Sequence, residues 1–539
     1  MAGIVVNKRY ISSSLQAAAQ NNNWSVLVFG VTNMGPAEPT LVQTYYDFLN
    51  TFGQPVSGVP THTYVKMLLD SGVSVLFKRI TFDGDLTSAK YFLNKNIDDT
   101  YCKMVAKDNY SGEVGNKIAV KLYTTVVDTN TTKANLDILF NSGVVESFTL
   151  GSVTSKDTLG SLFYNFIIST SEKSKYVDFS TSKETNDWST FDFNLTTDNH
   201  YQVVYTLSDG VTKIKDLSTA CVALANYDDT EWKWNEKEKA EKTKFSSFWN
   251  DRKLKNASVY YPLVRFVSAG GITSDDKPDT QDEVTTQDKI NINLGKFVTD
   301  CKNSFRALID YSIEKDITDV RNFIKSKTFT NTGINPSIYA YFGYWGYYDG
   351  IKLPGSAGFL SSLGKNGYNV YSRRIAGTSF SPAFTKMYKD IYIDEIPDWQ
   401  AEDNIQVNPI VVIDAQDNLA VMGSSTLAKP LESTNYRNPA QALDICLVGD
   451  YITNILSNLA YSQLEGSINR LSLTALSSSM NLEIQRFVTS GAISRFDITF
   501  DTTVLSKLYI YCTLYFPIGL EEVQLTVTSV YDPEVATIA

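Results

Sequence analysis

The segment Gly35–Gly53, GPAEPTLVQTYYDFLNTFG, constrains the fold most, because it combines a turn, a helix start and a helix end. It follows an apolar run, Ser25–Thr32, with the composition of a buried strand. Pro39 stands at a favourable first helical position, and Gly53 is expected to end the helix. Four residues recur at helical spacing: Val42, Tyr45, Tyr46 and Leu49. The segment predicts a strand, a turn and a helix from Pro39, which is one unit of an α/β domain.

Length and charge limit the class of protein. A chain of 539 residues is too long for one core, so several domains are expected. The net charge of −11 and the absence of a basic run argue against a direct nucleic-acid partner. The N-terminal sequence lacks the pattern of a secretory signal, and no apolar segment reaches the length of a membrane span. We therefore expect synthesis in the cytoplasm without export, and no membrane insertion.

Residues that usually carry chemistry are scarce. The two histidines, His62 and His200, are expected in loops, and their scarcity removes most routes to general-base catalysis and zinc binding. The five cysteines are odd in number and widely scattered, so free, buried thiols are expected: Cys102, Cys221, Cys301, Cys446 and Cys512. The acidic loop Asp275–Glu283 lacks the spacing of an EF-hand, and Ser268–Thr273 lacks the lysine of a P-loop and predicts a turn. No catalytic, cofactor or metal site is predicted.

Changes in pattern along the chain predict an α+β or α/β multidomain protein with an inserted β-rich part. The β-prone start of the chain ends in a polar joint, which predicts an extended arm. The expected segments are an N-terminal arm (1–22), an α/β body in two parts (23–110 and 216–378), a β-rich insertion (111–215), a C-terminal domain (379–518) and a C-terminal arm (519–539).

Two regions near the end of the α/β body have unusual compositions. The aromatic run Tyr339–Tyr348 is expected to pack in a core or an interface. Residues 350–367 are dominated by glycine, serine, proline and leucine, which predicts ordered loops. The C-terminal domain shows clearer patterns: two helices with apolar faces, the second ended by Gly491, and then strands of alternating polarity.

Three islands of sequence occur in an informative order. They are Phe29–Pro39 followed by Tyr46–Gly53, Ser111–Lys121 with its Gly-x-x-Gly-Asn turn, and a helix from Asp450–Ile452 leading to one that ends at Phe487–Ile493. Together they resemble the contractile-tail sheath proteins of myophages and related injection particles. The resemblance implies α/β sheath domains with an inserted β-rich outer domain and extended arms at both ends.

The resemblance also implies a function and partners. Sheath subunits stack as rings around an inner tail tube and contract to drive the tube through the host envelope during genome delivery. The implied partners are other copies of the chain, the tube protein, and baseplate and tail terminator proteins. The implied location is the virion tail, after assembly in the bacterial cytoplasm. The resemblance implies no enzyme activity and no cofactor.

Within that family, extended arms add strands to the sheets of neighbouring subunits, a form of β-augmentation. The implied N-terminal arm strand contains Val5, Val6, Arg9, Tyr10 and Ile11, and the C-terminal one contains Val523, Leu525 and Val527. The implied acceptor sheet contains Phe496, Ile498, Phe500, Leu508 and Ile510. The helices expected to face the tube carry four charges: Glu465, Arg470, Glu483 and Arg486.

Two alternatives from other classes stay open. A secreted carbohydrate-binding or glycan-cleaving protein would explain the aromatic residues, the β-rich insertion and the carboxylates such as Asp349, but it would need an export signal. Another virion component, such as a baseplate or capsid-surface protein, would explain the composition but not the order of the three islands.

Overall fold

The structure is a computed structural model, and its description covers residues 24–81, 89–96, 99–110, 113–128, 131–154, 156–169, 174–181, 195–196, 200–207, 216–227, 248–276, 284–313, 317–371, 380–392, 407–428, 439–461, 470–501 and 508–517. The chain divides into two compact units, residues 1–461 and 462–539, and each is described by itself. Some residues singled out in the sequence lie outside the described residues: Val5, Val6, Arg9, Tyr10, Ile11, Glu465, Val523, Leu525 and Val527.

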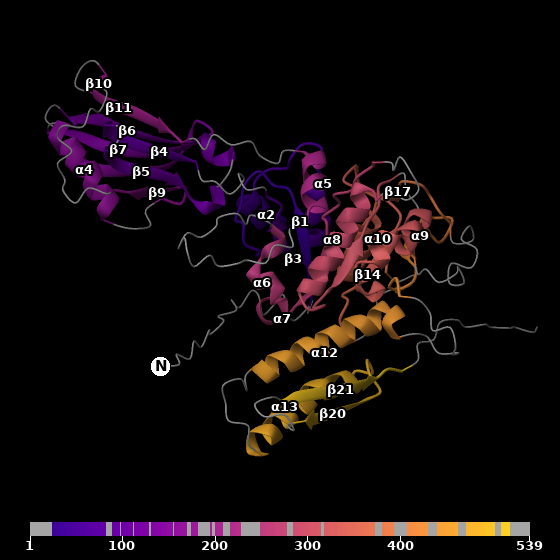
Figure 1. The fold of residues 1–539 in the computed structure, drawn as a ribbon. Coiled ribbons are helices and arrows are strands. Elements are labelled where there is room, and N and C mark those ends of the chain that lie inside the picture. Colours follow the sequence, from indigo (N-terminus) through magenta and orange to yellow (C-terminus); the bar gives the residue numbers. More distant parts are fainter. Residues whose placement is uncertain are drawn as a thin grey trace, which may run out of the picture. The chain divides into compact units, whose positions relative to one another are not determined.

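A predominantly parallel sheet forms the centre of the first unit (Figure 1). Its strand order is β19-β18-β14-β13-β12-β1-β3-β2. Neighbouring strands from β18 to β3 pair in parallel, and β2 and β19 pair antiparallel at the two edges. The strands are β1 (Ser25–Gly30), β2 (Thr40–Val42), β3 (Ser74–Arg79), β12 (Val264–Ser268), β13 (Arg306–Ile309), β14 (Tyr339–Gly343), β18 (Asn408–Val412) and β19 (Leu419–Val421). The expectation of a mixed α/β fold is confirmed.

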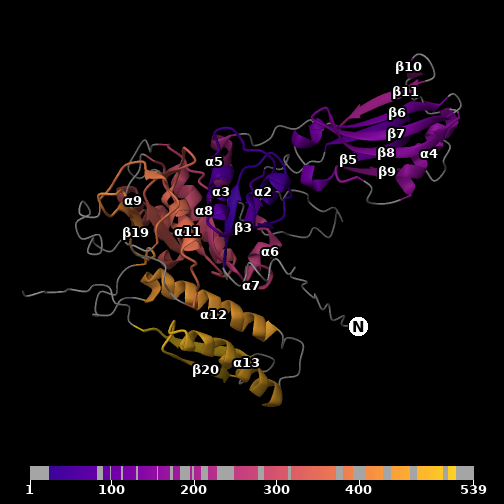
Figure 2. The ribbon, with the colours of Figure 1, turned by 180° about the vertical axis from the view of Figure 1, so that it is seen from behind.

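Helices cover both faces of this sheet (Figures 1 and 2), because parallel strands joined by helical crossovers are apolar on both sides. On one face α3 (Thr61–Asp70) contacts α11 (Gly355–Lys365), and Phe359 stacks on Phe342 of β14 at 3.6 Å between ring centroids. On the other face α5 (Leu217–Ala225) contacts α8 (Thr286–Asp300) over a core that includes Phe29. Further helices of this unit are α2 (Tyr45–Phe52), α6 (Arg252–Lys255), α7 (Ala257–Tyr260), α9 (Ile317–Lys325), α10 (Lys327–Thr330) and α12 (Leu443–Tyr461).

The Gly35–Gly53 segment differs from the sequence prediction at its start. Strand β2 occupies Thr40–Val42 and pairs with β3, so the predicted helix from Pro39 is wrong. Helix α2 begins only at Tyr45 because Thr44 provides an N-cap, its hydroxyl accepting a hydrogen bond from the Asp47 backbone N–H at 3.1 Å. The capping threonine therefore sets the helix start, and the proline does not.

The buried face of α2 also differs from the prediction. Phe48 and Phe52 are buried and contact the ring of Phe77 on β3, whereas Tyr46 is 73% exposed. Gly53 ends the helix as predicted, with φ at 81°. The other predicted face residues, Val42, Tyr45 and Leu49, do not form a helical stripe because Val42 lies in the preceding strand.

Helix α11 replaces the loops expected at residues 350–367, and that prediction is wrong. Its glycines allow close packing. A Cβ atom at Gly355 would lie 1.8 Å from the Phe342 carbonyl oxygen, and one at Gly364 would lie 2.3 Å from the Ser71 carbonyl oxygen. Glycine enrichment reflects close approach to the sheet and to α3 here. Before α11, β15 (Gly346–Tyr348) pairs with β16 (Ile351–Leu353) and with β17 (Lys386–Met387).

The part of the chain from residue 89 to residue 207 forms a β-rich body with its own apolar core. Five strands follow the order β10-β11-β6-β7-β8, three follow β4-β5-β9, and α4 (Lys156–Ile168) belongs to the same core. The strands are β4 (Lys90–Asn96), β5 (Asp99–Ala106), β6 (Ile118–Asp128), β7 (Thr131–Phe140), β8 (Gly143–Val153), β9 (Val177–Ser180), β10 (Leu195–Thr196) and β11 (His200–Thr206). Because β5 pairs with both β4 and β9, the strand pairing of this body starts before the expected residue 111.

The C-terminal elements are shared between the two units. Strands β18 and β19 belong to the large sheet, although the sequence placed them in a domain starting at residue 379. The second unit contains α13 (Arg470–Thr489), β20 (Arg495–Asp501) and β21 (Tyr509–Tyr515). The two predicted helices, here α12 and α13, and the glycine end at Gly491 are confirmed.

Both histidine predictions are wrong. His62 lies buried in α3, where its Nε2 is 3.1 Å from the Gly53 carbonyl oxygen, and burial lowers the pKa of the imidazole to about 4. His200 begins strand β11. Three of the free thiols are buried, as expected, but Cys446 and Cys512 are only partly buried. None of the helices in the described ranges is long and apolar enough to cross a membrane, and those ranges contain no group of three metal-ligating side chains.

Candidate functional site

The predicted acceptor sheet is a two-stranded hairpin. Strands β20 and β21 pair antiparallel in an unbroken register from Arg495 opposite Tyr515 to Asp501 opposite Tyr509. One face of the hairpin is half-buried, and it carries Phe496, Ile498, Phe500 and Ile510. Leu508 lies just before β21 and is also half-buried. The structure therefore brings the predicted acceptor residues together.

Both outer edges of this hairpin are unpaired within the described part of the chain, where its sheet has only two strands. A two-stranded sheet is marginally stable alone, and each free edge presents backbone N–H and C=O groups that can bind a further strand. The outward face carries the exposed side chains of Tyr509 and Tyr511, which suit the pleated surface of a larger sheet.

Helix α13 stabilises the hairpin from one side. It contacts β20 and buries four apolar side chains, Leu476, Met480, Ile484 and Phe487. Gly491 adopts φ of 79°, and the Ala492 backbone N–H donates to the Phe487 carbonyl oxygen at 2.9 Å, which turns the chain from helix to strand. The guanidinium of Arg495 lies 3.9 Å from the centre of the Tyr515 ring. The hairpin is thus held on one face while its edges stay open.

Three of the four charged residues expected to face the tube belong to helix α13. Arg470 is the first residue of α13, and Glu483 and Arg486 form an ion pair at 3.0 Å one turn apart. The exposed surface of the helix is otherwise small and polar, apart from Leu482, which is 64% exposed. Because Glu483 and Arg486 neutralise each other, the net charge of the α13 sequence is that of Arg470.

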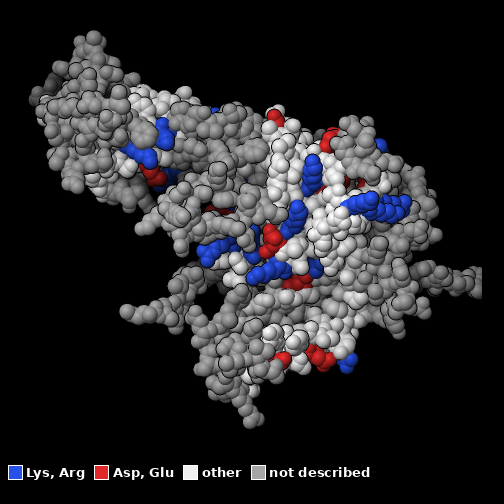
Figure 3. All heavy atoms as spheres, viewed as in Figure 1, with Lys and Arg blue, Asp and Glu red and all other residues white. Residues whose placement is uncertain are grey.

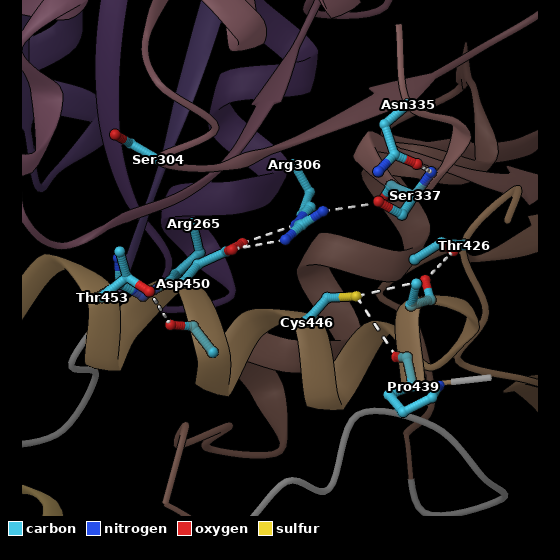
Figure 4. Close-up of polar contacts among 12 residues, drawn as sticks. Arg265, Ser304, Arg306, Asn335, Ser337, Thr426, Pro439, Cys446, Asp450 and Thr453 are labelled. Carbon is cyan, nitrogen blue, oxygen red and sulfur yellow. Dashed lines mark hydrogen bonds and ion pairs between the residues drawn. The ribbon is translucent and has the colours of Figure 1, made fainter. Parts of the chain in front are cut away.

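Within the first unit, a buried ion pair joins helix α12 to strand β13 (Figure 4). Arg306, the first residue of β13, donates from Nε and Nη2 to the two carboxylate oxygens of Asp450 at 2.6 and 2.5 Å, and from Nη1 to the Ser337 carbonyl oxygen at 3.0 Å. Burial alone would lower the pKa of Arg306, but the Asp450 carboxylate outweighs burial and raises it. Two-point contact fixes both the position and the rotation of α12.

A second arginine lies at the same helix. The register between β1 and β12 shifts so that Ser25 pairs with Val264 and Val26 with Phe266, which leaves Arg265 as the extra residue of a β-bulge. Its guanidinium is fully buried and lies 4.4 Å from the centre of the Tyr451 ring of α12, and its Nε and Nη2 form no hydrogen bond with the described residues. Two buried arginines therefore face a helix that supplies one buried carboxylate.

Sequence reasoning missed this attachment of α12. A signal was present, since Val264–Ser268 and Arg306–Ile309 each place one arginine in an otherwise apolar strand pattern. A buried strand tolerates an arginine only where an acceptor or an aromatic ring meets it.

A buried polar network lies at the carboxyl ends of β12 and β13. The Ser356 hydroxyl donates to Asp310 Oδ2 at 2.6 Å, and the Tyr64 hydroxyl lies 3.0 Å from Ser356 Oγ and 2.8 Å from Ser268 Oγ. Burial raises the pKa of Asp310 to about 7, although its hydrogen bonds from Ser356 oppose that shift. Asp310 is therefore the buried carboxyl expected to titrate near neutral pH.

Replacement of Asp310 with asparagine should reduce the dependence of stability on pH. A carboxyl with a raised pKa in the folded state favours folding while it is protonated, so stability is lost as the pH rises from about 4 to about 7. Three pKa units correspond to roughly 4 kcal/mol, an upper value for this site. Chemical unfolding at pH 5 and pH 8 should show a smaller difference for Asp310→Asn than for the parent, whereas the surface variant Asp390→Asn should behave like the parent. Equal pH dependence in all three proteins would contradict the assignment.

Comparison with known proteins gives structural matches only. No protein-family model and no curated protein matches the chain. The sheath tail protein of Listeria innocua has a TM-score of 0.53 at 13% identity, covering 93% of this chain and 98% of that one. The sheath tail protein of Desulfitobacterium hafniense has a TM-score of 0.48 at 11% identity, covering 96% and 100%. A sheath complex of an extracellular contractile injection system in the contracted state matches 42% of this chain and 64% of that one, at 10% identity and a TM-score of 0.31.

The Listeria match extends over almost the whole of both chains. The chain therefore has the fold of a tail sheath protein. The resemblance predicted from the three sequence islands is confirmed at the level of the fold.

Proposed function

We propose that this chain is the structural subunit of a contractile tail sheath. Its copies would stack as rings around an inner tail tube and contract to drive the tube through a host envelope during genome delivery. The observation that carries the proposal, beside the fold, is the β20–β21 hairpin, which is supported on one face and has no edge partner among the described residues. Such a hairpin suits the acceptor in strand exchange between subunits.

Strand addition is physically suited to a sheath that must move without coming apart. Main-chain hydrogen bonds between an arm and a neighbour's hairpin persist while rigid units rotate, and an extended arm of ~20 residues spans roughly 65 Å. Contraction then requires a metastable extended packing that relaxes to a more buried one, with no nucleotide hydrolysis. The role is therefore structural, without catalysis.

The proposed partners follow from this role. They are other copies of the chain, the inner tube protein, and baseplate and tail terminator proteins, in the tail of a virion assembled in the host cytoplasm. A direct nucleic-acid partner is not proposed. Figure 3 supports this, because on the face drawn the described Lys and Arg side chains lie among Asp and Glu side chains, with no continuous basic surface.

Electron microscopy of the purified full chain tests the function directly. Negative staining should show striated tubes or stacked rings, and mass photometry should show assemblies far larger than the 60.1 kDa subunit. A protein that stays monomeric under all assembly conditions, and binds glycans instead, would favour the carbohydrate-binding alternative and sink the sheath proposal.

Charge reversal at Arg470 should weaken attachment of the sheath to its tube. This residue starts α13 and carries the charge of that helix that the Glu483–Arg486 pair does not neutralise. We expect Arg470→Glu to leave the subunit folded and to reduce the number of tubes that carry an extended sheath about tenfold, a loss of about 1.4 kcal/mol. The matched reversal Arg252→Glu, on α6 of the first unit, should have no effect. Normal extended sheaths with Arg470→Glu would refute the assignment.

A further inference from the structure

A polar pocket lies beside the Arg306–Asp450 pair and has no part in the strand-exchange model. Its volume is about 290 Å³, and it is lined by the turn after α8, the residues that precede β14, and one side of α12. It therefore lies at the amino ends of β13 and β14, with Asn335 and Thr453 at opposite sides of the ion pair in Figure 4.

The turn after α8 has an unusual backbone. Lys302 and Asn303 have φ values of 58° and 54°, a left-handed conformation that two successive residues with side chains rarely adopt. This turn ends α8, with the Asn303 backbone N–H donating to the Val298 carbonyl oxygen at 2.9 Å, and it places both side chains in the lining of the pocket. The Lys302 ammonium has no ion-pair partner in the described part of the chain.

Two amide side chains complete the lining. The Oδ1 atom of Asn335 accepts from the Ser337 backbone N–H at 3.0 Å, so Nδ2 remains a donor, and Figure 4 shows it pointing away from Ser337. Asn454 of α12 is only 5% exposed and lines the pocket, and its side-chain amide forms no hydrogen bond with another described residue. An amide that lines a pocket without an internal partner can donate a hydrogen bond to a bound acceptor.

The charge balance of the lining is positive. Both carboxylate oxygens of Asp450 are bound by Arg306, so Asp450 offsets that arginine and leaves the charge of Lys302 uncompensated. A partly enclosed pocket with an ammonium and amide donors favours a negatively charged acceptor. We propose that this pocket binds an oxyanion, a carboxylate or phosphate group held by Lys302, Asn335 and Asn454.

The oxyanion has two conceivable sources with the same chemistry. One is a free small anion. The other is an acidic side chain of a second copy of the chain, which has 59 acidic residues against 48 basic ones, and this source rests on the proposed sheath function. The two sources predict different results in the experiment below.

Inorganic phosphate is the probe for the free anion. Thermal unfolding of the full chain should shift upward by about 3 °C in saturating phosphate relative to sodium chloride of equal ionic strength, because a ligand of the folded state stabilises it. Lys302→Gln and Asn454→Ala should each lose this shift. Lys289→Gln, which removes an exposed charge from α8, should keep it. The same shift in Lys302→Gln as in the parent would overturn the pocket assignment.

A polymerisation assay tests whether the oxyanion is an acidic side chain of a second copy of the chain. If a neighbour's carboxylate occupies the pocket, Lys302→Gln should raise the protein concentration needed for polymers about tenfold, phosphate should compete in the parent only, and Lys289→Gln should have no effect. Normal polymerisation of Lys302→Gln together with a phosphate shift in the parent assigns the pocket to a free anion. If no polymers form at all, the sheath proposal fails while the phosphate shift still supports the pocket. Absence of both responses overturns the inference.

Discussion

Deletion of residues 1–20 should abolish polymerisation of the chain and leave both units folded. In the proposed sheath these residues add a strand to the hairpin of a neighbour, whose β20 and β21 edges are unpaired within the described residues. Deletion of residues 520–539 should act in the same way through the other end of the chain. Circular dichroism and thermal unfolding should match the full chain, while electron microscopy and mass photometry should show only monomers.

The large size of this expected effect follows from cooperativity. An added strand contributes several main-chain hydrogen bonds at once, and it converts a marginal two-stranded hairpin into a sheet that is stable by itself. Subunits that exchange strands in a ring lose contacts on both sides when an arm is missing. Assembly should therefore fail at every concentration that supports it in the full chain.

Proline substitutions test whether assembly requires the N-terminal arm to add a strand or requires only the length of that arm. Val6→Pro with Tyr10→Pro removes two backbone donors from the β-prone run and keeps the arm at full length. Gln20→Pro with Asn22→Pro introduces the same change in the polar joint and should leave assembly intact. Tubes of normal length from the first pair, or from either deletion, would contradict the strand-exchange model.

The sequence predicted the parts of the fold that depend on strong local patterns. The strand at Ser25–Gly30 and the helix α13 with its glycine end have clear periodicity and clear boundaries, and both were predicted. Helix α2 began late because the capping hydroxyl of Thr44 outweighed the proline signal. Helix α11 was not predicted because a helix whose glycines allow close packing has the same glycine-rich composition as a loop.

The candidate site also contains features that a local sequence pattern predicts and features that it does not. Alternation in β20 and β21 was enough to predict two strands with one half-buried face, whereas their role as an acceptor came from the family resemblance and stays a prediction. The attachment of α12 joins Arg306 to Asp450, 144 positions apart, and no local pattern connects residues at that separation. The roles of the arms and of the surface that faces the tube concern contacts between chains, so they stay predictions.

Removal of the Asp450 carboxylate should loosen α12 more than any surface change in the same unit. Asp450→Asn leaves Arg306 without its charged partner, and the guanidinium of Arg265 is already buried with two nitrogens that bond to no described residue. An uncompensated buried charge costs roughly 3–5 kcal/mol. Amide hydrogen exchange in Leu443–Tyr461 should therefore accelerate at least about a hundredfold, since local opening becomes that much easier.

An exposed ion pair provides the control. Glu483→Gln removes the acidic member of the pair with Arg486, whose side chain is 59% exposed, and such pairs contribute only about 0–1 kcal/mol. Its effect on exchange in its own helix should be less than about tenfold. A similarly small effect of Asp450→Asn on α12 would show that water or another group replaces the carboxylate.

Replacing both Arg306 and Asp450 tests separately what the pair contributes to the free energy of unfolding and to the orientation of α12. Arg306→Met with Asp450→Leu removes two buried charges together, so the free energy of unfolding should recover most of the loss, because the desolvation costs of the pair disappear while the buried charge of Arg265 remains. The two-point contact that fixes the rotation of α12 disappears as well. If the pair serves assembly by orienting this helix, the double variant should be stable as a monomer yet polymerise poorly. Stable monomers that polymerise normally would show instead that apolar packing alone positions α12.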